Sequence, residues 1–245
     1  KIFFLKISQK ESGINMQIKT ALILCAGFGK RLHPLTLKDP KPLLNFQDNT
    51  LLEHTLILIK KLNIKKVKLN TYYLKEKIEK FIKSKNFDLD IDIINDGEQI
   101  LDTGGGVFNM IKKTTDENFF VFNPDTFWND QYIDYIKNME NFYFKNKIDN
   151  ILLLAHQNLS FDKKLKGDFN FNKSLISRVY PCDFIYTGCQ ILNKKIFSNI
   201  YESQFSINML WSQLIEKKKL FGYESKNKFI HITDLEIYKK LLKNN

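Results

Sequence analysis

Short apolar runs alternate with stretches of helical periodicity along most of this chain, and this alternation constrains the fold more than any other feature. From Ile18 onward, each strand-like run is followed by a segment in which apolar residues recur every three or four positions. Strands that alternate with helices form mostly parallel sheets with helices on both faces. The sequence therefore predicts an α/β protein with one Rossmann-like domain, whose mostly parallel mixed sheet is flanked by helices.

The same patterns predict the individual elements. Strands are expected at 20–25, 65–72, 89–96, 118–123, 150–156 and 228–232, with shorter β-like stretches ending near residue 192. Helices are expected at 50–62, 74–82, 103–111, after residue 130, at 206–218 and at 234–242. Ligands of doubly wound sheets bind where loops leave the carboxyl ends of the strands. The loops 26–44, 96–106 and 123–129 are therefore the candidate binding loops.

Length and composition are compatible with one folded domain. The chain has 245 residues, of which 43% are hydrophobic and 27% charged, as is typical of soluble globular proteins. Residues 1–15 precede Met16 and are interpreted as a leader or a mis-assigned start, so the single domain is expected over 16–245. No run approaches the roughly 18 apolar residues of a membrane span. Three cysteines without a CxxC pair favour a reducing compartment, so a cytoplasmic protein without a membrane partner is expected.

The formal net charge of +11 raises the question of a nucleic-acid partner. Lysines are scattered along the whole chain together with abundant isoleucine and asparagine, which is typical of a compositional bias rather than of a localised binding patch. No aromatic and basic recognition motif accompanies the charge. We expect no nucleic-acid partner, and the sequence leaves the oligomeric state open.

The segment LCAGFGKRLHPLTLKDPKPLL at 24–44 directly follows the first predicted strand and is suited to polyphosphate. Gly27 and Gly29 permit a sharp turn and a close approach of backbone N–H groups to phosphate oxygens. Transfer reactions at phosphorus need mainly positioning and neutralisation of negative charge. Three side chains of the segment supply positive charge: Lys30, Arg31 and Lys41.

This segment resembles the opening signature of the sugar-1-phosphate nucleotidylyltransferases, L-x-A-G-x-G-x-R-x-x-P-x-T followed by K-P-L. The segments LDTGGGVF and FNPDTFWND stand where that family has its glycine loop and its metal-binding strand end. The resemblance implies a nucleotide-diphospho-sugar transferase fold of the GT-A-like type. The short form, with its TGGG loop and xDxxW element, is most similar to N-acetylmuramate-1-phosphate uridylyltransferases and to short mannose-1-phosphate guanylyltransferases. The matching residues are Leu24, Ala26, Gly27, Gly29, Arg31, Pro34, Thr36, Lys41, Pro42 and Leu43.

The resemblance implies an enzyme of nucleotide-sugar biosynthesis, as in cell-wall sugar metabolism. It would transfer a nucleoside monophosphate from a nucleoside triphosphate, UTP in the most similar subgroup, to a sugar 1-phosphate. The products would be pyrophosphate and a nucleotide-sugar, and the cofactor Mg²⁺ or Mn²⁺. Two alternatives stay open: a cytidylyltransferase acting on choline phosphate, which shares the opening signature, and a catalytically altered or inactive protein that binds a nucleotide or nucleotide-sugar.

The resemblance also implies residue roles. The catalytic residues would be Arg31, Lys41 and Asp125. Nucleotide contacts would come from Leu24, Cys25, Ala26, Gly27, Gly29, Lys30, Arg31, Gly104, Gly105 and Asn123. The sugar phosphate would contact Lys41, Glu98, Asp125 and Gly188, and the metal would bind Asp125, with His231 in the place of the second ligand.

Several residues depart from the family pattern and motivate the binding-protein alternative. His231 replaces the second metal-binding aspartate, and imidazole suits softer metals than Mg²⁺, so a structural histidine at a strand end is an equal alternative. Pro124 replaces a glycine and removes a backbone donor beside Asp125. His33 replaces an arginine, and Cys25 replaces an alanine, which is expected to place a thiol beside the nucleotide, where bound nucleotide would slow its alkylation.

Overall fold

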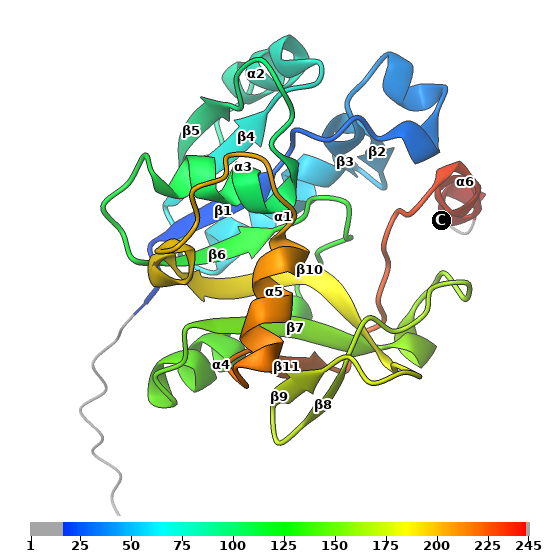
Figure 1. Ribbon diagram of the computed structural model, residues 1–245. Helices are drawn as coiled ribbons and strands as arrows, with labels where there is room; N and C mark the ends of the chain where they lie inside the picture. The colour runs from blue at the N-terminus through cyan, green and yellow to red at the C-terminus, as the bar shows by residue number, and fades with distance from the viewer. Residues whose placement is uncertain (1–16, 244–245) are drawn as a thin grey trace, which may run out of the picture.

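The computed structural model describes residues 17–243, and these residues build a nine-stranded sheet with helices on both faces (Figure 1). The strands of this sheet are β1 (Thr20–Leu24), β4 (Lys66–Thr71), β5 (Asp90–Asn95), β6 (Asn118–Phe122), β7 (Asn150–His156), β8 (Asn170–Asn172), β9 (Leu175–Ser177), β10 (Phe184–Asn193) and β11 (Phe221–Ser225). The helices are α1 (Leu51–Lys61), α2 (Lys75–Lys83), α3 (Asp102–Ile111), α4 (Tyr132–Lys145), α5 (Ile207–Glu216) and α6 (Leu235–Lys243). The predicted leader at 1–15 lies outside the described residues.

The sheet order is β5-β4-β1-β6-β10-β7-β11-β9-β8. Strands β5, β4, β1 and β6 are parallel, whereas β10 runs antiparallel between β6 and β7. The chain leaves β1 toward β4 and β5 on one side and returns to β6 on the other. The predicted α/β class and mixed, mostly parallel sheet are therefore confirmed, and a topological switch point lies between β1 and its neighbours, where such folds bind ligands.

The alternation of side chains along the buried strands divides the core into two layers. Ala21 and Ile23 of β1 pack with apolar side chains of α1, α2 and α4, whereas Leu22 packs with those of α3 and α5. Figure 1 shows α3 and α5 in front of the sheet. Strands buried on both faces read as continuous apolar runs, which explains the pattern of 20–25. None of the helices in the described part is long and apolar enough to span a membrane.

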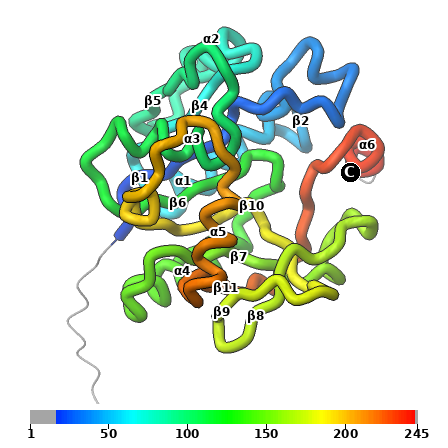
Figure 2. Tube along the Cα trace, in the orientation of Figure 1, coloured from blue at the N-terminus to red at the C-terminus, as the bar shows by residue number. Residues whose placement is uncertain are grey.

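A small hairpin of β2 (Asn45–Phe46) and β3 (Asn49–Thr50) precedes α1 and ties the loop 26–44 to the rest of the molecule. Thr50 caps α1: its hydroxyl accepts from the Glu53 N–H, and the Glu53 carboxylate accepts from the Thr50 N–H. The last helix, α6, packs against this region although it lies at the other end of the sequence (Figure 2). The Tyr238 hydroxyl donates to the Asn45 carbonyl at 2.6 Å.

The strand predicted at 228–232 is wrong. This segment makes only isolated bridges, between Ser160 and Phe229 and between Thr126 and His231. The strand at this point of the chain is β11, which the patterns missed and which pairs in parallel with β7 from Phe221 onward. Because the edge of β7 is taken by β11, segment 228–232 instead runs past the loops that follow β6 and β7. The other elements match the prediction to within the few residues by which helix and strand ends usually vary.

Gly104 and Gly105 are required by packing between α3 and the segment 203–207. A Cβ at Gly105 would stand 2.1 Å from the Ser203 carbonyl oxygen, and one at Gly104 would stand 2.4 Å from the Phe205 ring. We expect Gly105→Ala to lower the free energy of unfolding by about 2–3 kcal/mol, since the backbone of 203 must move away. Urea unfolding measures this change.

Gly27→Ala is the matched control for this prediction, because a Cβ at Gly27 meets nothing within 4 Å and its φ is not positive. Its unfolding free energy is expected to stay within about 0.5 kcal/mol of the wild type. Equal stabilities of the two alanine variants would contradict the packing role of Gly105.

Candidate functional site

A cavity of about 240 Å³ opens at the carboxyl ends of β1, β4 and β6. All three predicted binding loops contribute to its wall, which is the arrangement expected at a switch point of an α/β sheet. Its lining residues are Leu24, Cys25, Ala26, Gly27, Gly29, Lys41, Pro42, Asn70, Ile100, Asp102, Thr103, Asn123, Pro124 and Asp125. This cavity is called the first cavity below.

A second cavity of about 540 Å³ adjoins the first and shares four wall residues with it. Most of the remaining wall comes from the segment 168–190 and from residues 206–211 of α5 and its N-cap, which both lie in the second half of the chain, and Val107 of α3 completes it. Its lining residues are Leu24, Asp102, Thr103, Val107, Asn123, Asp168, Phe169, Arg178, Tyr180, Tyr186, Gln190, Ser206, Ile207, Asn208 and Trp211. The two cavities together offer adjoining places for two substrates.

The loop 26–44 folds back on itself and so presents Lys41 to the first cavity. Gly29 has a φ of 63°, a backbone conformation that glycine adopts without strain. The Thr36 hydroxyl donates to the Gly29 carbonyl at 2.8 Å, and the Cβ of Lys41 lies within 3.2 Å of the place that a Cβ on residue 29 would occupy. The close approach therefore requires glycine at this position, in agreement with the signature.

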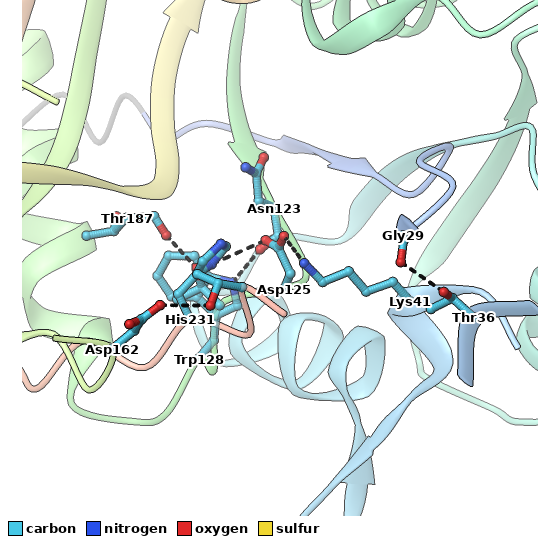
Figure 3. Close-up of polar contacts among 11 residues, drawn as sticks. Gly29, Thr36, Lys41, Asn123, Asp125, Trp128, Asp162, Thr187 and His231 are labelled. Atoms are coloured by element: carbon cyan, nitrogen blue, oxygen red, sulfur yellow. Dashed lines mark hydrogen bonds and ion pairs between the residues drawn. The ribbon is translucent and has the colours of Figure 1, made fainter. Parts of the chain in front are cut away.

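Lys41 and Asp125 form an ion pair in the wall of the first cavity (Figure 3). The Lys41 ammonium donates to Asp125 Oδ2 at 2.6 Å, and the two side chains are 13% and 21% exposed. On the other side of the carboxylate, His231 Nδ1 lies 3.6 Å from Asp125 Oδ1. The structure thus brings together two of the predicted catalytic residues and the predicted second metal ligand.

The surroundings of Asp125 control its charge. Burial by itself would raise the pKa of this carboxyl, but the opposing charges at His231 and Lys41 bring the pKa down to about 2. Burial lowers the pKa of His231, and the nearby charges of Lys41 and Arg31 lower it further against the attraction of Asp125. His231 is therefore mostly neutral near pH 7, where the Lys41 ammonium is the charged partner of Asp125. The imidazole adds its charge to the lowering of the Asp125 pKa only at a pH low enough to protonate it.

The backbone that carries Asp125 is held on several sides. The Asn123 N–H donates to the Gly188 carbonyl at 2.8 Å, and the Trp128 indole donates to the Asn123 carbonyl at 3.0 Å. The Thr126 hydroxyl donates to the Thr187 carbonyl at 2.7 Å (Figure 3). These bonds fasten the strand end to β10, so the carboxylate is positioned before any ligand arrives.

The oxygen atoms of Asp125 suit a hard divalent cation that arrives with a nucleotide. Asp125 Oδ1 is buried and has no hydrogen-bond partner within the described residues. Mg²⁺ in nucleotide sites is held by one or two carboxylates together with substrate phosphates and water. No cluster of three or more His, Cys, Asp or Glu able to hold a metal ion occurs among residues 17–243. The chain therefore offers a carboxylate ligand for Mg²⁺, and substrate phosphates would supply further ligands.

Asn70 belongs to the site although the sequence reasoning did not name it. It lies in β4, where its side-chain carbonyl accepts from the Cys25 N–H at 2.9 Å and its amide donates to Asp96 at 2.8 Å. It is buried and lines the first cavity. Its place near the carboxyl end of a predicted strand, beside the predicted binding loops, is the signal that would have identified it.

The Cys25 side chain is only 1% exposed, and burial raises the pKa of its thiol far above the usual range. The expectation that nucleotide protects this thiol from alkylation is therefore corrected, because a buried neutral thiol does not react. We expect no alkylation of Cys25 by iodoacetamide in the folded protein at pH 8, with or without nucleotide. Peptide mass spectrometry measures it, and labelling in urea is the positive control. Rapid labelling of the folded protein would contradict the burial.

The basic residues at the start of the loop are not among the lining residues of the two cavities, although the charge of Arg31 reaches His231. Lys30 and Arg31 are exposed in the turn 30–32, and Lys30 Nζ lies 5.3 Å from the Phe28 ring centre. Neither lines the first or the second cavity. Glu98 is likewise exposed and lines neither. The contacts predicted for Lys30 and Arg31 with the nucleotide, and for Glu98 with the sugar, therefore stay predictions.

The predicted ligand contacts of Gly104, Gly105 and Gly188 stay predictions, and the structure gives these three glycines a role in packing. Gly104 and Gly105 face the segment 203–207 and do not line the cavities, where Asp102 and Thr103 stand instead. Gly188 has a φ of 91°, and a Cβ there would stand 2.9 Å from the Asn123 Cβ. The glycines thus permit close packing, which positions the neighbouring residues that do line the cavities.

A family model described as "Nucleotidyl transferase" matches residues 20–157, more than half of the chain. Over 223 residues the chain is 24% identical to the N-acetylmuramate alpha-1-phosphate uridylyltransferase of Caulobacter vibrioides, covering 88% of this chain and 92% of that protein. It is 31% identical over 210 residues to a bifunctional GlmU protein of Methanococcus maripaludis, covering 83% of this chain. This chain spans about half, 49%, of that bifunctional protein.

The same fold occurs in a solved structure of UDP-glucose pyrophosphorylase complexed with UDP-glucose. The TM-score is 0.76 at 17% sequence identity, and the match covers 93% of this chain and 98% of the other. Identity at this level shows a common fold. The sheet and its flanking helices, derived above from the packing of apolar faces, are thus those of a known nucleotide-sugar enzyme.

Proposed function

This chain belongs to the nucleotidyl transferase family of sugar-1-phosphate nucleotidylyltransferases, and we propose that it transfers uridine monophosphate from UTP to a sugar 1-phosphate. The products are pyrophosphate and a UDP-sugar. The observation that carries this proposal is the Lys41–Asp125 pair in the wall of the first cavity, beside the glycine-containing loop. A cation and an oxygen ligand stand there next to backbone groups that fit phosphate.

The reaction forms one phosphorus–oxygen bond and breaks another. An oxygen of the sugar 1-phosphate attacks the α-phosphorus of the triphosphate, and the bond from that phosphorus to the oxygen bridging to the β-phosphate breaks. The electron pair leaves with pyrophosphate. The attacking phosphate is largely ionised at neutral pH, so the step needs no protein side chain as a base.

In this step, the protein positions the reactants and balances charge. Lys41, released from Asp125 by the incoming phosphates, donates to a phosphate oxygen near the α-phosphorus. Backbone groups of residues 26–29 contact the base and phosphates, and Asn123 lies where both cavities meet. Asp125 would hold a divalent cation, and when bound that cation neutralises charge on the phosphates. His231 lies beside this position and would be a second, uncharged side chain next to the cation.

UTP is proposed as the donor because one relative that matches over most of both chains is named a uridylyltransferase. GTP is the competing donor, because another relative, 27% identical and covering 91% of this chain and 96% of its own, is named a guanylyltransferase. The test is pyrophosphate release by the purified protein with Mg²⁺ or Mn²⁺. The panel combines four nucleoside triphosphates with the 1-phosphates of N-acetylmuramate, mannose and glucose, and with choline phosphate. Turnover restricted to GTP or CTP would replace the proposed base, and turnover with choline phosphate would favour the cytidylyltransferase alternative. Absence of turnover with every pair would refute the enzymatic proposal.

His231 favours a second candidate function, which is nucleotide binding without turnover. Its neutral imidazole stands 3.6 Å from Asp125, where a second carboxylate would strengthen a magnesium site. We expect His231→Asp to lower the Mg²⁺ concentration needed for half-maximal turnover, and to raise turnover at limiting Mg²⁺ about tenfold. Pyrophosphate release over a Mg²⁺ titration measures both effects. Reduced activity in a folded variant would show that the imidazole is part of the working site, whereas unchanged activity would show that residue 231 does not bind the metal.

A further inference from the structure

We infer that the second cavity accepts a sugar 1-phosphate that carries an additional carboxylate, and that Arg178 recognises this carboxylate. The inference rests on the proposed function, because it names the acceptor class of the same site. It concerns the half of the chain that the signature does not cover, where the wall of the cavity is built by the segment 168–190 and α5.

Arg178 presents an oriented guanidinium to the second cavity. Its Nη1 donates to the Ser212 hydroxyl at 3.0 Å, and its Nη2 donates to Asn208 Oδ1 at 2.5 Å. The guanidinium carbon lies 4.8 Å from the centre of the Phe169 ring. Both hydrogen-bond partners on α5 are neutral. Asp168 lies in the same wall, where the charge of Arg178 opposes the rise that burial causes in the pKa of its carboxyl, but the two side chains form no ion pair among the described residues. The Arg178 side chain is therefore held in place, and a ligand carboxylate would compete with Asp168 for its charge.

The choice of arginine at this position is informative in a chain so rich in lysine. Of the 38 basic residues only Arg31 and Arg178 are arginine. One stands in the signature loop and the other in the second cavity. A lysine would serve a site that needs only a point charge, whereas the planar guanidinium matches a carboxylate with two parallel hydrogen bonds. The bias against arginine makes its presence in the cavity wall an indication of geometric recognition.

Arg178 and the reacting phosphate lie in different compartments. Lys41 and Asp125 line the first cavity and are absent from the wall of the second, while Arg178 lines only the second. The residues common to both walls, among them Asp102 and Thr103, separate the two ends. An acceptor whose phosphate reaches Lys41 therefore directs the far side of its sugar ring toward Arg178.

The rest of the second cavity fits a polar acceptor with one acidic group. The Tyr186 hydroxyl is buried, has no hydrogen-bond partner among the described residues, and belongs to a residue of the cavity wall. The first turn of α5, with Ser206 and Asn208, also faces the cavity, and a helix N-terminus favours an anion. Asp168 stands in the same wall, where one of its oxygens accepts from the Tyr186 N–H at 2.9 Å. Its other oxygen is suited to a sugar hydroxyl.

The test compares acceptors that differ only in the carboxylate. N-acetylmuramate 1-phosphate is paired with its methyl ester, and glucuronate 1-phosphate is paired with glucose 1-phosphate. For each, kcat and KM are measured with saturating UTP for the wild type, Arg178→Gln and Arg178→Lys. Lys173→Gln is the matched control, because it removes one positive charge from the exposed turn between β8 and β9.

In at least one pair, the wild type should prefer the acid by about 10- to 100-fold in kcat/KM, mainly through KM, as expected for a charge-assisted hydrogen-bonded pair. Arg178→Gln should lose this preference while its activity on the neutral partner, its KM for UTP and its thermal midpoint stay close to the wild type. Arg178→Lys should retain part of the preference, and Lys173→Gln all of it.

Two results would overturn the inference: a wild type that does not prefer the acid in either pair, or an Arg178→Gln variant whose activity on acid and neutral acceptors falls equally. The second result would mean that Arg178 binds the phosphate common to all acceptors. If no acceptor is turned over, the proposed function fails separately, and titration of the same compounds against the fluorescence of Trp211 in the cavity wall decides the inference. Tighter binding of the acid, lost in Arg178→Gln, supports it; equal or absent binding refutes it.

Discussion

Lys41→Met should lower kcat for nucleotidyl transfer by about 10²- to 10³-fold, the range found when a single charge-stabilising donor is removed from an active site. Lys41 is the one lysine in the wall of the first cavity, and its ammonium already lies 2.6 Å from Asp125. Methionine keeps the length and apolar stem of the side chain, so the loop 26–44 should fold unchanged. The loss should therefore appear in kcat, with a smaller change in the KM for UTP.

The same variant should also lose stability at pH 7, because the Asp125 carboxylate keeps a buried oxygen but loses its charged partner. The pair is partly exposed, so the cost is expected to be about 1–2 kcal/mol, below that of a fully buried pair. Single-turnover kinetics and urea unfolding measure the two effects separately.

Lys38→Met is the matched control, since Lys38 lies in the same loop but is exposed and lines neither cavity. Its kcat and stability should equal those of the wild type. A Lys41→Met variant with wild-type turnover would contradict the central place of the Lys41–Asp125 pair in the proposed mechanism.

Asp125→Asn should reduce turnover by about 10³-fold or more, because an amide retains the shape of the side chain but loses the negative charge that a divalent cation needs. The variant should still bind UTP in the absence of metal. The addition of Mg²⁺ should no longer strengthen the binding of UTP to this variant. Isothermal titration of UTP with and without Mg²⁺ tests this part, and pyrophosphate release tests the turnover.

The effect of Asp125→Asn on stability should depend on pH. The folded-state pKa of about 2 is below the ordinary value of about 3.9. Such a carboxylate stabilises the folded protein above the unfolded-state pKa, and the stabilisation is lost as the pH falls through the folded-state pKa. The wild type should therefore exceed the variant by on the order of 1–2 kcal/mol at pH 7, and this difference should shrink between about pH 4 and pH 2.

Asp130→Asn provides the control, because Asp130 lies in the same loop and its side chain is 70% exposed in a surface ion pair with Lys61. Neither its turnover nor the pH dependence of its stability should differ measurably from the wild type. A pH-independent stability difference for Asp125→Asn would mean that the carboxylate has an ordinary pKa and no tight partner.

The sequence predicted the class of fold and the location of the site from local patterns. Short apolar runs such as 20–25 and 118–123 are typical of buried strands, and parallel strands bring the loops after them to one edge. Lys41 and Asp125, 84 residues apart, were predicted to act together on that basis and on the family resemblance, and they form an ion pair.

Local patterns were less informative about residues whose environment is made by distant segments. Segment 228–232 has the composition of a strand, but β11 occupies the edge of β7, so the segment runs past the β6 loop instead. The glycines at 104 and 105 match a ligand loop in sequence, yet they pack against 203–207. Cys25 sits within the signature, but its thiol lies in the core.

The sequence by itself determined the α/β alternation, the phosphate-suited loop with its glycines and Lys41, and the carboxylate at the end of a buried strand, because each depends on neighbours close along the chain. Only the tertiary structure decided that Asn70 holds the Cys25 backbone and that Arg178 lines the second cavity. These contacts join segments that many residues separate. Their formation depends on how sheet edges and helix faces pack, which no short stretch of sequence specifies.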